Sequence, residues 1–322
     1  MREPTFSVVI ATKNREALLR DTLAALAAQA WPRDRFEILV ADNGSTDNTK
    51  AVVCRAARTP GAPRIVYRHI TTPGKSHAVN ALLKEVAGDL IALTDDDVVP
   101  EPTWLQAFAT AFEETGADYA AGRILPQWES DPPAWLSEPL YGVLAIPDNG
   151  GKRLMLGPDQ DGRSVIPVGA NMAVRACVVK KIGGLRHDLG KLEGTLRTGE
   201  DHEFFLRMVS AGFKGVYEPA ALVHHFVPRS RLERSYFRRW LYQNGKDVCR
   251  LEATHAGDVR RLLRVPRYLW RQAAADAVSM VKAGVAGDTR GRFAASTRLI
   301  WFGGYIRDAW STFAMASADK CA

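Results

Sequence analysis

The sequence predicts an α/β protein with a mostly parallel central sheet, helices on both faces, and a C-terminal helical extension. Short β-branched runs alternate with segments of helical period through the first hundred residues. This alternation is typical of parallel strands joined by crossover helices. After about residue 229 the apolar residues recur only at helical spacing. We therefore expect an α/β domain over residues 1–228 and a helical region over residues 229–322.

The elements follow from hydrophobic period and from breaker residues. Strands are expected at Phe6 to Thr12, Phe36 to Ala41, Ile65 to Ile70, Asp89 to Thr94, Asp118 to Ile124, Ser164 to Val174 and Gly215 to Phe226. Helices are expected at Arg15 to Ala30, Thr46 to Arg58, Ser76 to Ala87, Pro102 to Glu114 and Asp201 to Ala211. Between them, the stretch from Pro126 to Pro167 shows no sustained period. A segment of that length inside a compact domain usually carries function.

Composition excludes several protein classes. With 322 residues and 46% hydrophobic side chains, the chain can build a large core, so disordered and fibrous classes are excluded. The 4 cysteines form no CxxC pair, which favours a reduced, cytoplasmic protein over a zinc or disulfide scaffold. The N-terminal residues do not show the arrangement of a secretory signal, and no run reaches the roughly 18 apolar residues of a membrane-spanning helix.

Charge is divided unevenly along the chain. Residues 226–322 carry 18 basic and 8 acidic side chains, whereas the upstream residues are slightly acidic. The same region holds 4 of the 8 tryptophans and two apolar stripes of helical period. The stripes are Val265, Leu269, Ala273, Ala277 and Met280, and Leu299, Phe302, Ile306, Ala309 and Phe313. Basic amphipathic helices with aromatic residues fit an anionic membrane surface, while packing on the catalytic domain is the alternative. Nucleic acid is disfavoured as a partner because no recognised binding motif accompanies the charge.

Polar clusters follow several of the predicted strands, where open α/β sheets bind their ligands. Asp95, Asp96 and Asp97 come directly after the apolar run from Leu90 to Leu93. Three adjacent carboxylates at the edge of a core repel one another unless a cation or buried donors neutralise them. Hard divalent cations prefer such oxygen ligands, although a turn before Pro100 is the alternative.

Three further positions have both a structural and a functional interpretation. Asp42 ends a strand, where it either starts a turn and a helix cap or accepts a hydrogen bond from a nucleobase or ribose. Glu200 and Asp201 either stabilise the start of a helix through its dipole or lie at the mouth of that helix facing the cleft. His225 shares a strand face with Val223 and is either structural or a metal ligand.

Taken in order, six motifs resemble the family 2 glycosyltransferases, the inverting nucleotide-sugar enzymes of the GT-A fold. They are FSVVIATKNR, EILVADNGSTDNT, GKSHAVNALLKEVAGDLIALTDDDVVP, VGANMAVRACVVKKIGG, TGEDHEFFLRMVSAGF and YEPAALVHHF, and they span about residues 5–228. An aromatic residue often found at the position of Lys13 is missing, as is a basic residue just before Asn80.

The resemblance implies roles for individual residues. Asp42 would contact the base of the nucleotide, with Ala11 and Lys13 lining the same pocket, and Asp95 would lie near the ribose or the metal. Asp97 would bind a divalent ion, Mn²⁺ or Mg²⁺, with His225 completing that site. Asp201 would be the general base, with Glu200 beside it. Further residues expected to bind the nucleotide sugar are Lys75, Asn80, Asp96 and Asn171.

We therefore expect an inverting, metal-assisted glycosyltransferase that moves a sugar from a nucleotide-diphosphate donor to a glycan or lipid-linked acceptor. Synthesis of a surface polysaccharide or glycolipid at the inner face of the cell membrane would suit such a protein. In the candidate acceptor segment from Pro126 to Pro167, Trp128, Trp135 and Tyr141 either stack on sugars or anchor the segment. A sugar-phosphate nucleotidyltransferase is the alternative enzyme, but residues 11–15 contain no glycine to form a triphosphate loop. A non-catalytic binding protein is disfavoured by the retention of both acidic motifs.

Overall fold

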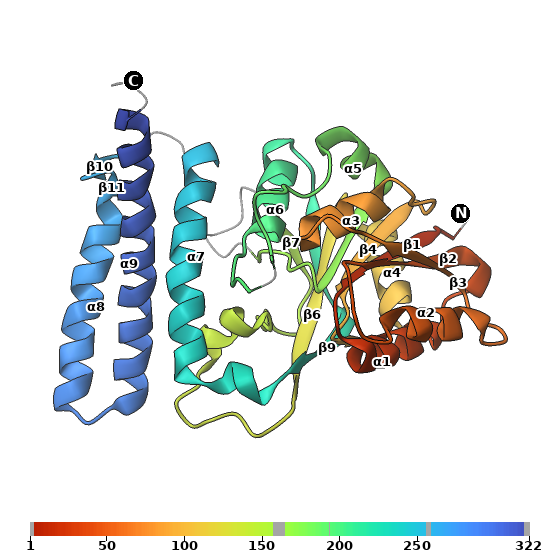
Figure 1. Ribbon diagram of the computed structural model, residues 1–322, viewed down its shortest axis with the longest axis horizontal. Coiled ribbons are helices and arrows are strands. Elements are labelled where there is room, and N and C mark those ends of the chain that lie inside the picture. Colours follow the sequence, from red (N-terminus) through yellow and green to blue (C-terminus); the bar gives the residue numbers. More distant parts are fainter. Residues whose placement is uncertain (1–2, 157–164, 193, 256–258, 319–322) are drawn as a thin grey trace. The chain divides into compact units, whose positions relative to one another are not determined.

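The structure is a computed structural model that describes residues 3–156, 165–192, 194–255 and 259–318 (Figure 1). The chain forms two compact units. Unit 1 comprises Met1–Gln127, Ala145–Glu193 and Glu200–Phe226, and unit 2 comprises Trp128–Leu144, Gly194–Gly199 and Val227–Ala322. The last crossing between the units falls close to the expected division at residue 228. Unit 2 also takes in two shorter segments that the sequence pattern assigned to the α/β domain.

Unit 1 is an α/β unit around one sheet. Its first four strands are parallel in the order β3-β2-β1-β4. They are β1 (Phe6–Thr12), β2 (Phe36–Asp42), β3 (Arg64–His69) and β4 (Leu90–Asp95). The later strands complete a sheet of nine among the described residues, and the pairings β4–β8, β8–β6, β9–β5 and β9–β7 are antiparallel. They are β5 (Val98–Pro100), β6 (Tyr119–Trp128), β7 (Leu154–Leu156), β8 (Asn171–Arg175) and β9 (Gly215–Val227).

Helices cover both faces of this sheet, as predicted. They are α1 (Glu16–Ala27), α2 (Thr49–Arg58), α3 (Lys75–Leu83), α4 (Trp104–Thr115), α5 (Ala176–Ile182) and α6 (Glu200–Ser210), with a 3₁₀ turn η1 (Arg33–Arg35) before β2. Helices α1 and α2 pack together on one face, and α3 lies on the other (Figure 1). Val9 and Leu39 belong to the buried cluster that includes residues of α3, α5 and α6. Because strand side chains alternate, their neighbours Val8 and Ile38 point to the opposite face.

One predicted strand is wrong in its bounds. The sequence pattern indicated a strand from Ser164 to Val174, but β8 begins only at Asn171. Residues 165–168 have no regular structure, and Ser164 lies outside the described residues. Pro167 cannot donate to a ladder, and Gly169 lies against the carboxylate of Asp201, so this segment serves the site described below instead of extending the strand.

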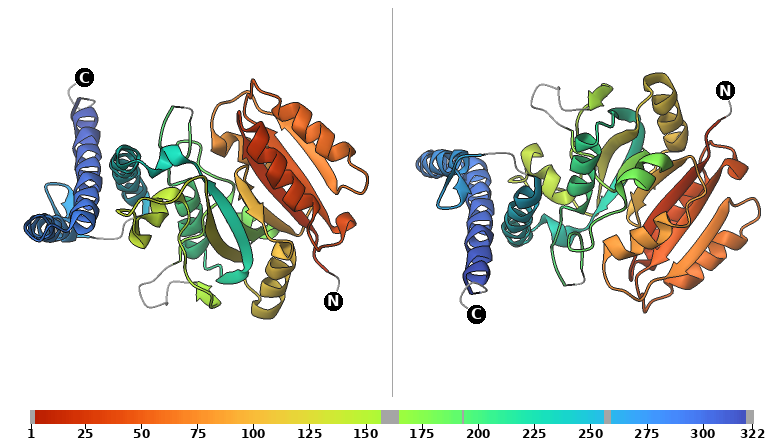
Figure 2. Two further views of the ribbon diagram at one scale, coloured as in Figure 1. Left: turned by 90° about the horizontal axis from the view of Figure 1, so that it is seen from below. Right: turned by 90° about the horizontal axis from the view of Figure 1, so that it is seen from above.

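Unit 2 is mainly helical (Figure 2). It contains η2 (Glu138–Leu144), η3 (Arg229–Leu232), α7 (Arg234–His255), the short hairpin β10 (Arg261–Leu262) and β11 (Val265–Pro266), α8 (Arg267–Val285) and α9 (Thr289–Ala318). Helix α9 packs against both α7 and α8. A Cβ atom at Gly304 would lie 2.0 Å from the backbone oxygen of Tyr242, so glycine permits the close approach of α7 and α9. Among the described residues, no helix combines the length and the apolarity that crossing a bilayer requires.

The two predicted apolar stripes form part of the core of unit 2. Leu269 and Ala273 of α8 pack with Phe302, Ile306 and Ala309 of α9 in one cluster. Val265 joins the same cluster from β11 instead of from a helix, and the side chain of Phe313 lies outside the described residues. These side chains therefore pack between elements of unit 2, which is neither the membrane contact nor the packing on the catalytic domain that the sequence pattern suggested for them.

Aromatic residues of the candidate acceptor segment also pack inside unit 2. The ring of Trp135 lies 5.1 Å from that of Phe237 and 4.6 Å from that of Phe293. Trp128 and Tyr141 make an edge contact at 5.9 Å. These contacts match the anchoring interpretation of the three aromatic residues. Residues 157–164 of the segment lie outside the described residues.

Candidate active site

The register of the parallel strands brings the predicted polar strand ends together. Ala11 of β1 pairs with Ala41 of β2 on one side and with Asp95 of β4 on the other. Thr12 pairs with Asp42 at the end of β2. The residues predicted to line a nucleotide pocket therefore share one edge of the sheet, beyond the carboxyl ends of its strands.

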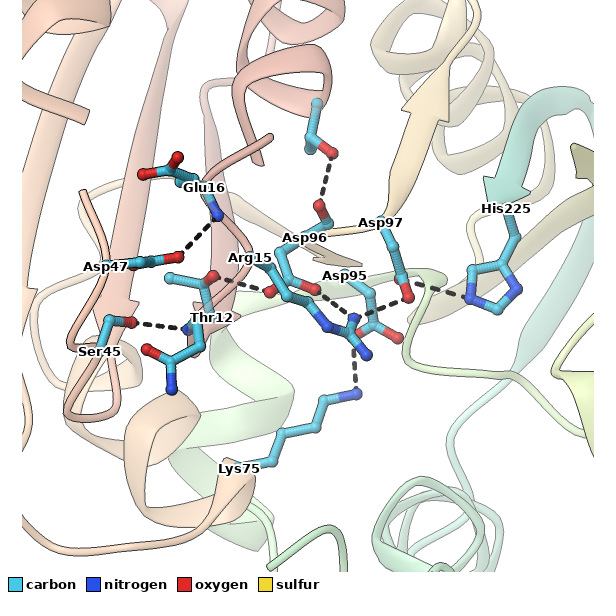
Figure 3. A network of polar contacts seen from close by, with 12 residues as sticks. Thr12, Arg15, Glu16, Ser45, Asp47, Lys75, Asp95, Asp96, Asp97 and His225 are labelled. Carbon is cyan, nitrogen blue, oxygen red and sulfur yellow. Dashed lines mark hydrogen bonds and ion pairs between the residues drawn. The ribbon is translucent and has the colours of Figure 1, made fainter. Parts of the chain in front are cut away.

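Asp96 and Asp97 are buried, and Arg15 joins them. One guanidinium nitrogen, Nη1 of Arg15, lies 2.7 Å from Oδ1 of Asp96 and 2.7 Å from Oδ2 of Asp97 (Figure 3). Thr12 donates its hydroxyl hydrogen bond to Asp96 at 2.7 Å. Burial raises the pKa of Asp96 although Arg15 opposes it. The carboxylates of Asp96 and Asp97 are therefore held in place by a cation from the loop after β1.

Lys75, the first residue of α3, links the acidic triplet to the start of α6. Its Nζ lies 2.6 Å from Oδ1 of Asp95 and 4.0 Å from Oε1 of Glu200. Burial acts to lower the pKa of Lys75, but Asp95, Asp201 and Glu200 outweigh it and raise that pKa. For Asp95, burial acts to raise the pKa and the Lys75 charge reverses the direction, so the carboxyl group stays ionised.

Glu200 and Asp201 begin α6 and differ in exposure. Glu200 is buried, whereas Asp201 is partly exposed. The backbone N–H of Gly169 donates to Oδ2 of Asp201 at 2.9 Å. A Cβ atom at position 169 would lie 2.6 Å from the other oxygen of Asp201, so a side chain here would displace that carboxylate. Burial, reinforced by Asp201, raises the pKa of Glu200 to about 7, and burial, reinforced by Asp95, raises the pKa of Asp201.

His225 approaches the triplet from β9. The register of β5 with β9 places Val98 beside His225, and Nε2 of the imidazole lies 3.3 Å from Oδ1 of Asp97 (Figure 3). The ring is buried, and its Nδ1 has no hydrogen-bond partner among the described residues. Within the described part of the chain, no three His, Cys, Asp or Glu side chains are arranged as a ready metal cage. Asp97 and His225 nevertheless present two ligand atoms at a separation that neighbouring ligands of an octahedral ion would have, about 3 Å for bonds of about 2.1 Å.

The other end of the sheet edge holds Asp42. Its Oδ1 accepts from the backbone N–H of Ser45 at 2.8 Å, and its Oδ2 accepts from the Tyr67 hydroxyl at 2.7 Å. Burial, together with Asp42, raises the pKa of Tyr67. Asp42 is buried, and each of its carboxylate oxygens has a further lone pair beyond these two hydrogen bonds. Ala11 and Lys13, at the end of β1 and just after it, are partly exposed.

Two residues predicted to bind the nucleotide sugar have other roles. Asn171 is fully buried: its oxygen accepts from Trp104 Nε1, and its amide donates to the carbonyls of Arg123 and Ala221, each at 2.8 Å. Asn80 both donates to and accepts from the backbone of Leu185, at 2.7 and 2.8 Å. We therefore correct the assignment of Asn171, which is buried and holds the segments around β8. Asn80 holds the segment after α5 but is partly exposed, so its contact with the nucleotide sugar stays a prediction.

Three residues of the site belong to polar clusters at predicted strand ends, but the sequence pattern assigned them no individual role. Arg15 and Thr12 hold the triplet, and Gly169 receives Asp201. The need for a counter-charge was the available signal for Arg15, since adjacent buried carboxylates require a cation and a neighbouring strand end supplies a basic residue. No comparable signal marked Gly169, because its contact is with a residue 32 positions away.

Comparison with known proteins identifies the family of the chain. Residues 7–180 match the family model of Glycosyl transferase family 2, so the chain belongs to this family of enzymes. The matched region contains the acidic triplet but ends before Glu200 and Asp201. Two curated relatives are the "Pre-mycofactocin glycosyltransferase" of Mycobacterium tuberculosis, 27% identical over 164 residues, and the "Glucosyl-dolichyl phosphate glucuronosyltransferase" of Haloferax volcanii, 23% identical over 175 residues. These matches cover 51% and 53% of this chain, but only 31% and 54% of the relatives' own lengths.

Solved structures confirm the GT-A fold. The mannosyltransferase PcManGT from Pyrobaculum calidifontis, in complex with GDP-Man and Mn²⁺, aligns with a TM-score of 0.67 at 19% identity. That alignment covers 97% of this chain and 88% of that structure. S. aureus TarS 1-349 in complex with UDP aligns with a TM-score of 0.54 at 16% identity, covering 96% of this chain and 91% of that structure.

Proposed function

We propose that this protein is an inverting glycosyltransferase that moves a sugar from a nucleotide-diphosphate donor to a hydroxyl group of a glycan or lipid-linked acceptor. One observation carries the proposal. Lys75 lies within 2.6 Å of Asp95 and 4.0 Å of Glu200, so the acidic triplet and the Glu200–Asp201 pair converge on one cation. A single displacement needs both a diphosphate-binding region and a base in one place.

Asp201 is the base in this proposal. Its carboxylate takes the proton of the acceptor hydroxyl as that oxygen attacks the anomeric carbon, and the bond from this carbon to the diphosphate breaks on the opposite face. The raised pKa makes Asp201 a stronger proton acceptor than an exposed aspartate. Its partial exposure leaves it accessible to an acceptor, whereas Glu200 beside it is buried. The hydrogen bond from Gly169 fixes the orientation of the carboxylate.

The residues fit a divalent cation. Asp97 and His225 would hold it as first ligands, with Asp95 next to them, because their oxygen and nitrogen atoms suit Mn²⁺ or Mg²⁺. When bound, such an ion supplies positive charge against the diphosphate leaving group. Before donor and ion bind, the positive charges of Arg15 and Lys75 offset the repulsion among the three carboxylates. The PcManGT complex, which contains GDP-Man and Mn²⁺, supports a nucleotide sugar and a metal together.

The edge formed by Asp42, Ala11 and Lys13 is the proposed pocket for the nucleoside. The partly exposed ends of β1 and the free lone pairs of Asp42 support this position. The name of the Haloferax volcanii relative, which includes a dolichyl phosphate, supports a lipid-linked acceptor.

The test is donor binding followed by turnover. UDP-, GDP- and dTDP-sugars are added with Mn²⁺ or with EDTA, and one of them should raise the melting temperature only in the presence of metal. Turnover should release a nucleoside diphosphate and a product of inverted anomeric configuration. Asp97→Asn should abolish the metal-dependent shift, whereas Asp21→Asn, at an exposed site on α1, should keep it. Release of pyrophosphate from a nucleoside triphosphate, or metal-independent binding of every donor, would contradict the proposal.

A further inference from the structure

The outer side of α8 exposes apolar side chains to an unusual degree. Of twelve large exposed apolar residues in the described chain, seven lie between residues 259 and 285. We define the α8 face by six of them, Leu262, Leu263, Tyr268, Val278, Val281 and Val285. Leu263 is 64% exposed, Val281 63% and Val285 87%. Scattered exposed apolar residues are normal, but a concentration along one surface marks an interaction site.

This face is not the packing side of the helix. Leu269 and Ala273 of α8 pack with α9, and successive residues turn by 100°. Val278 is therefore on the opposite side from Leu269, with Tyr268, Val281 and Val285 within about a quarter turn of it. With 19 residues α8 is about 28 Å long, so its apolar face is a strip and not a point.

A strained hairpin precedes the N-terminal end of α8 (Figure 1). β10 and β11 are joined by Leu263 and Arg264, whose φ angles are 48° and 69°. Two-residue turns of this kind normally use asparagine and glycine, because other side chains strain in the left-handed region. Trp270 Nε1 donates to the carbonyl of Leu262 at 3.1 Å, and Trp310 Nε1 donates to that of Leu263 at 3.0 Å. Two indoles thus hold the tip in a conformation that displays leucine.

The charges along the strip are mostly positive. Residues 259–285 contain five arginines and one lysine, of which Arg267, Arg271 and Lys282 are exposed on α8. The segment has a single acidic residue, Asp276, which is buried and accepts from Arg298 Nε at 2.5 Å. At 100° per residue, Arg267, Arg271 and Lys282 lie within about 40° of Val278, so the cations are interspersed with the apolar side chains of this face. A face that combines exposed apolar and cationic side chains is complementary to a surface that is both anionic and apolar.

We propose that the α8 face lies on an anionic lipid bilayer, with the leucines of the hairpin and the valines of α8 inserted among the acyl chains. Arginines next to the strip would contact lipid phosphates. Nucleic acid offers anionic charge but nothing to cover exposed valine and leucine. A second copy of this face would bring like charges together. This inference does not depend on the donor site, since it uses residues of unit 2 alone.

The test is flotation of the full chain with vesicles. The protein should float with vesicles of equimolar phosphatidylcholine and phosphatidylglycerol, less so as salt rises, and should not float with phosphatidylcholine alone. The double variant Leu262→Thr, Leu263→Asn should bind anionic vesicles at least about tenfold more weakly than the native chain. Its folding should be intact, because threonine suits a strand and asparagine tolerates positive φ.

Matched variants separate the strip from general surface chemistry. Leu154→Ser with Met155→Ser alters two exposed apolar residues of unit 1 and should leave flotation unchanged. Arg267→Glu with Arg271→Glu should weaken binding about tenfold or more, whereas Lys84→Glu with Lys180→Glu, at exposed sites of unit 1, should not.

Several results would overturn the inference. These are failure of the full chain to float with anionic vesicles at low salt, equal binding by the hairpin variant, and a concentration-dependent dimer that only the hairpin variant loses. Donor-induced thermal shifts measured on the same variants should not change. Loss of the donor-induced thermal shift together with normal flotation would count against the proposed transferase function but not against the proposed membrane surface.

Discussion

The acidic edge of unit 1 and the α8 face of unit 2 use charge in opposite ways. At the edge, carboxylates are buried or partly buried, and cations from α3 and from the loop after β1 lie within 2.7 Å of all three aspartates of the triplet. On α8, the cations are exposed and the segment's single acid is buried. Buried pairs of opposite charge hold atoms in place and shift pKa values. Exposed charges of one sign attract a surface that carries the opposite charge. The comparison teaches that burial, more than composition, decides what a cluster of charges can do.

The largest effect should come from Asp201→Asn. If the acidic edge performs chemistry, loss of the base should lower turnover by about 10²–10⁴-fold. The KM for donor should change little, because the amide keeps the size of the side chain and its hydrogen bond from Gly169. Steady-state kinetics measure both parameters, with Asp21→Asn as the matched control. Turnover within a few-fold of the native enzyme would show that Asp201 is only a helix-start residue.

Lys75→Met should have the largest effect on stability. It leaves Asp95 and Glu200 without their shared cation. Breaking a fully buried pair costs about 3–5 kcal/mol, and the cost here should be lower because Lys75 and Asp95 are about one fifth exposed. Lys75 lowers the pKa of Asp95, so its contribution is present above the unfolded pKa of about 4 and is lost as pH falls through the folded value. Denaturant unfolding should therefore show a large difference at neutral pH that shrinks in acid. Lys84→Met, at an exposed position, should show no such difference.

Glu200→Gln should change how stability depends on pH. Since the folded pKa of Glu200 is raised to about 7, the folded state binds a proton more tightly than the unfolded chain does. The native protein should therefore lose stability as pH rises from about 4.5 to about 7, by up to about 3 kcal/mol from this group. Glutamine removes that loss, so the variant should become more stable relative to the native protein as pH rises. Parallel unfolding curves across this range would contradict the raised pKa.

The smallest expected effect concerns the α8 face of unit 2. Leu263→Asn relieves strain at a residue with φ of 48°, so it should stabilise the protein by about 0.5–1 kcal/mol. Thermal unfolding measures the change, with Leu262→Thr as a control at a position of ordinary strand geometry. A stabilised variant that binds anionic vesicles less well would show that the strained leucine serves binding and not folding.

Much of unit 1 was predictable because its signals are local. The parallel strands β1, β2 and β4 follow from runs of adjacent apolar residues, and Asp95–Asp97 follow directly from one of them. The bounds of β8 were not predictable, because Val165 and Ile166 look like strand residues while their segment serves Asp201. Asn171 looked like a ligand-binding residue because sequence shows its polarity but not its burial.

By itself, the sequence determined the alternation of strands and helices, the family motifs and the uneven distribution of charge, since each is a property of neighbouring residues. Only the tertiary structure decided which cation meets which carboxylate. Arg15 and Asp96 are 81 positions apart, and Lys75 reaches Asp95 and Glu200 from a third element. Likewise, only packing against α9 decided which side of α8 stays exposed, because an amphipathic stripe does not specify what covers it. The physical reason is the same in both cases: burial and pairing depend on residues that the fold alone brings into contact.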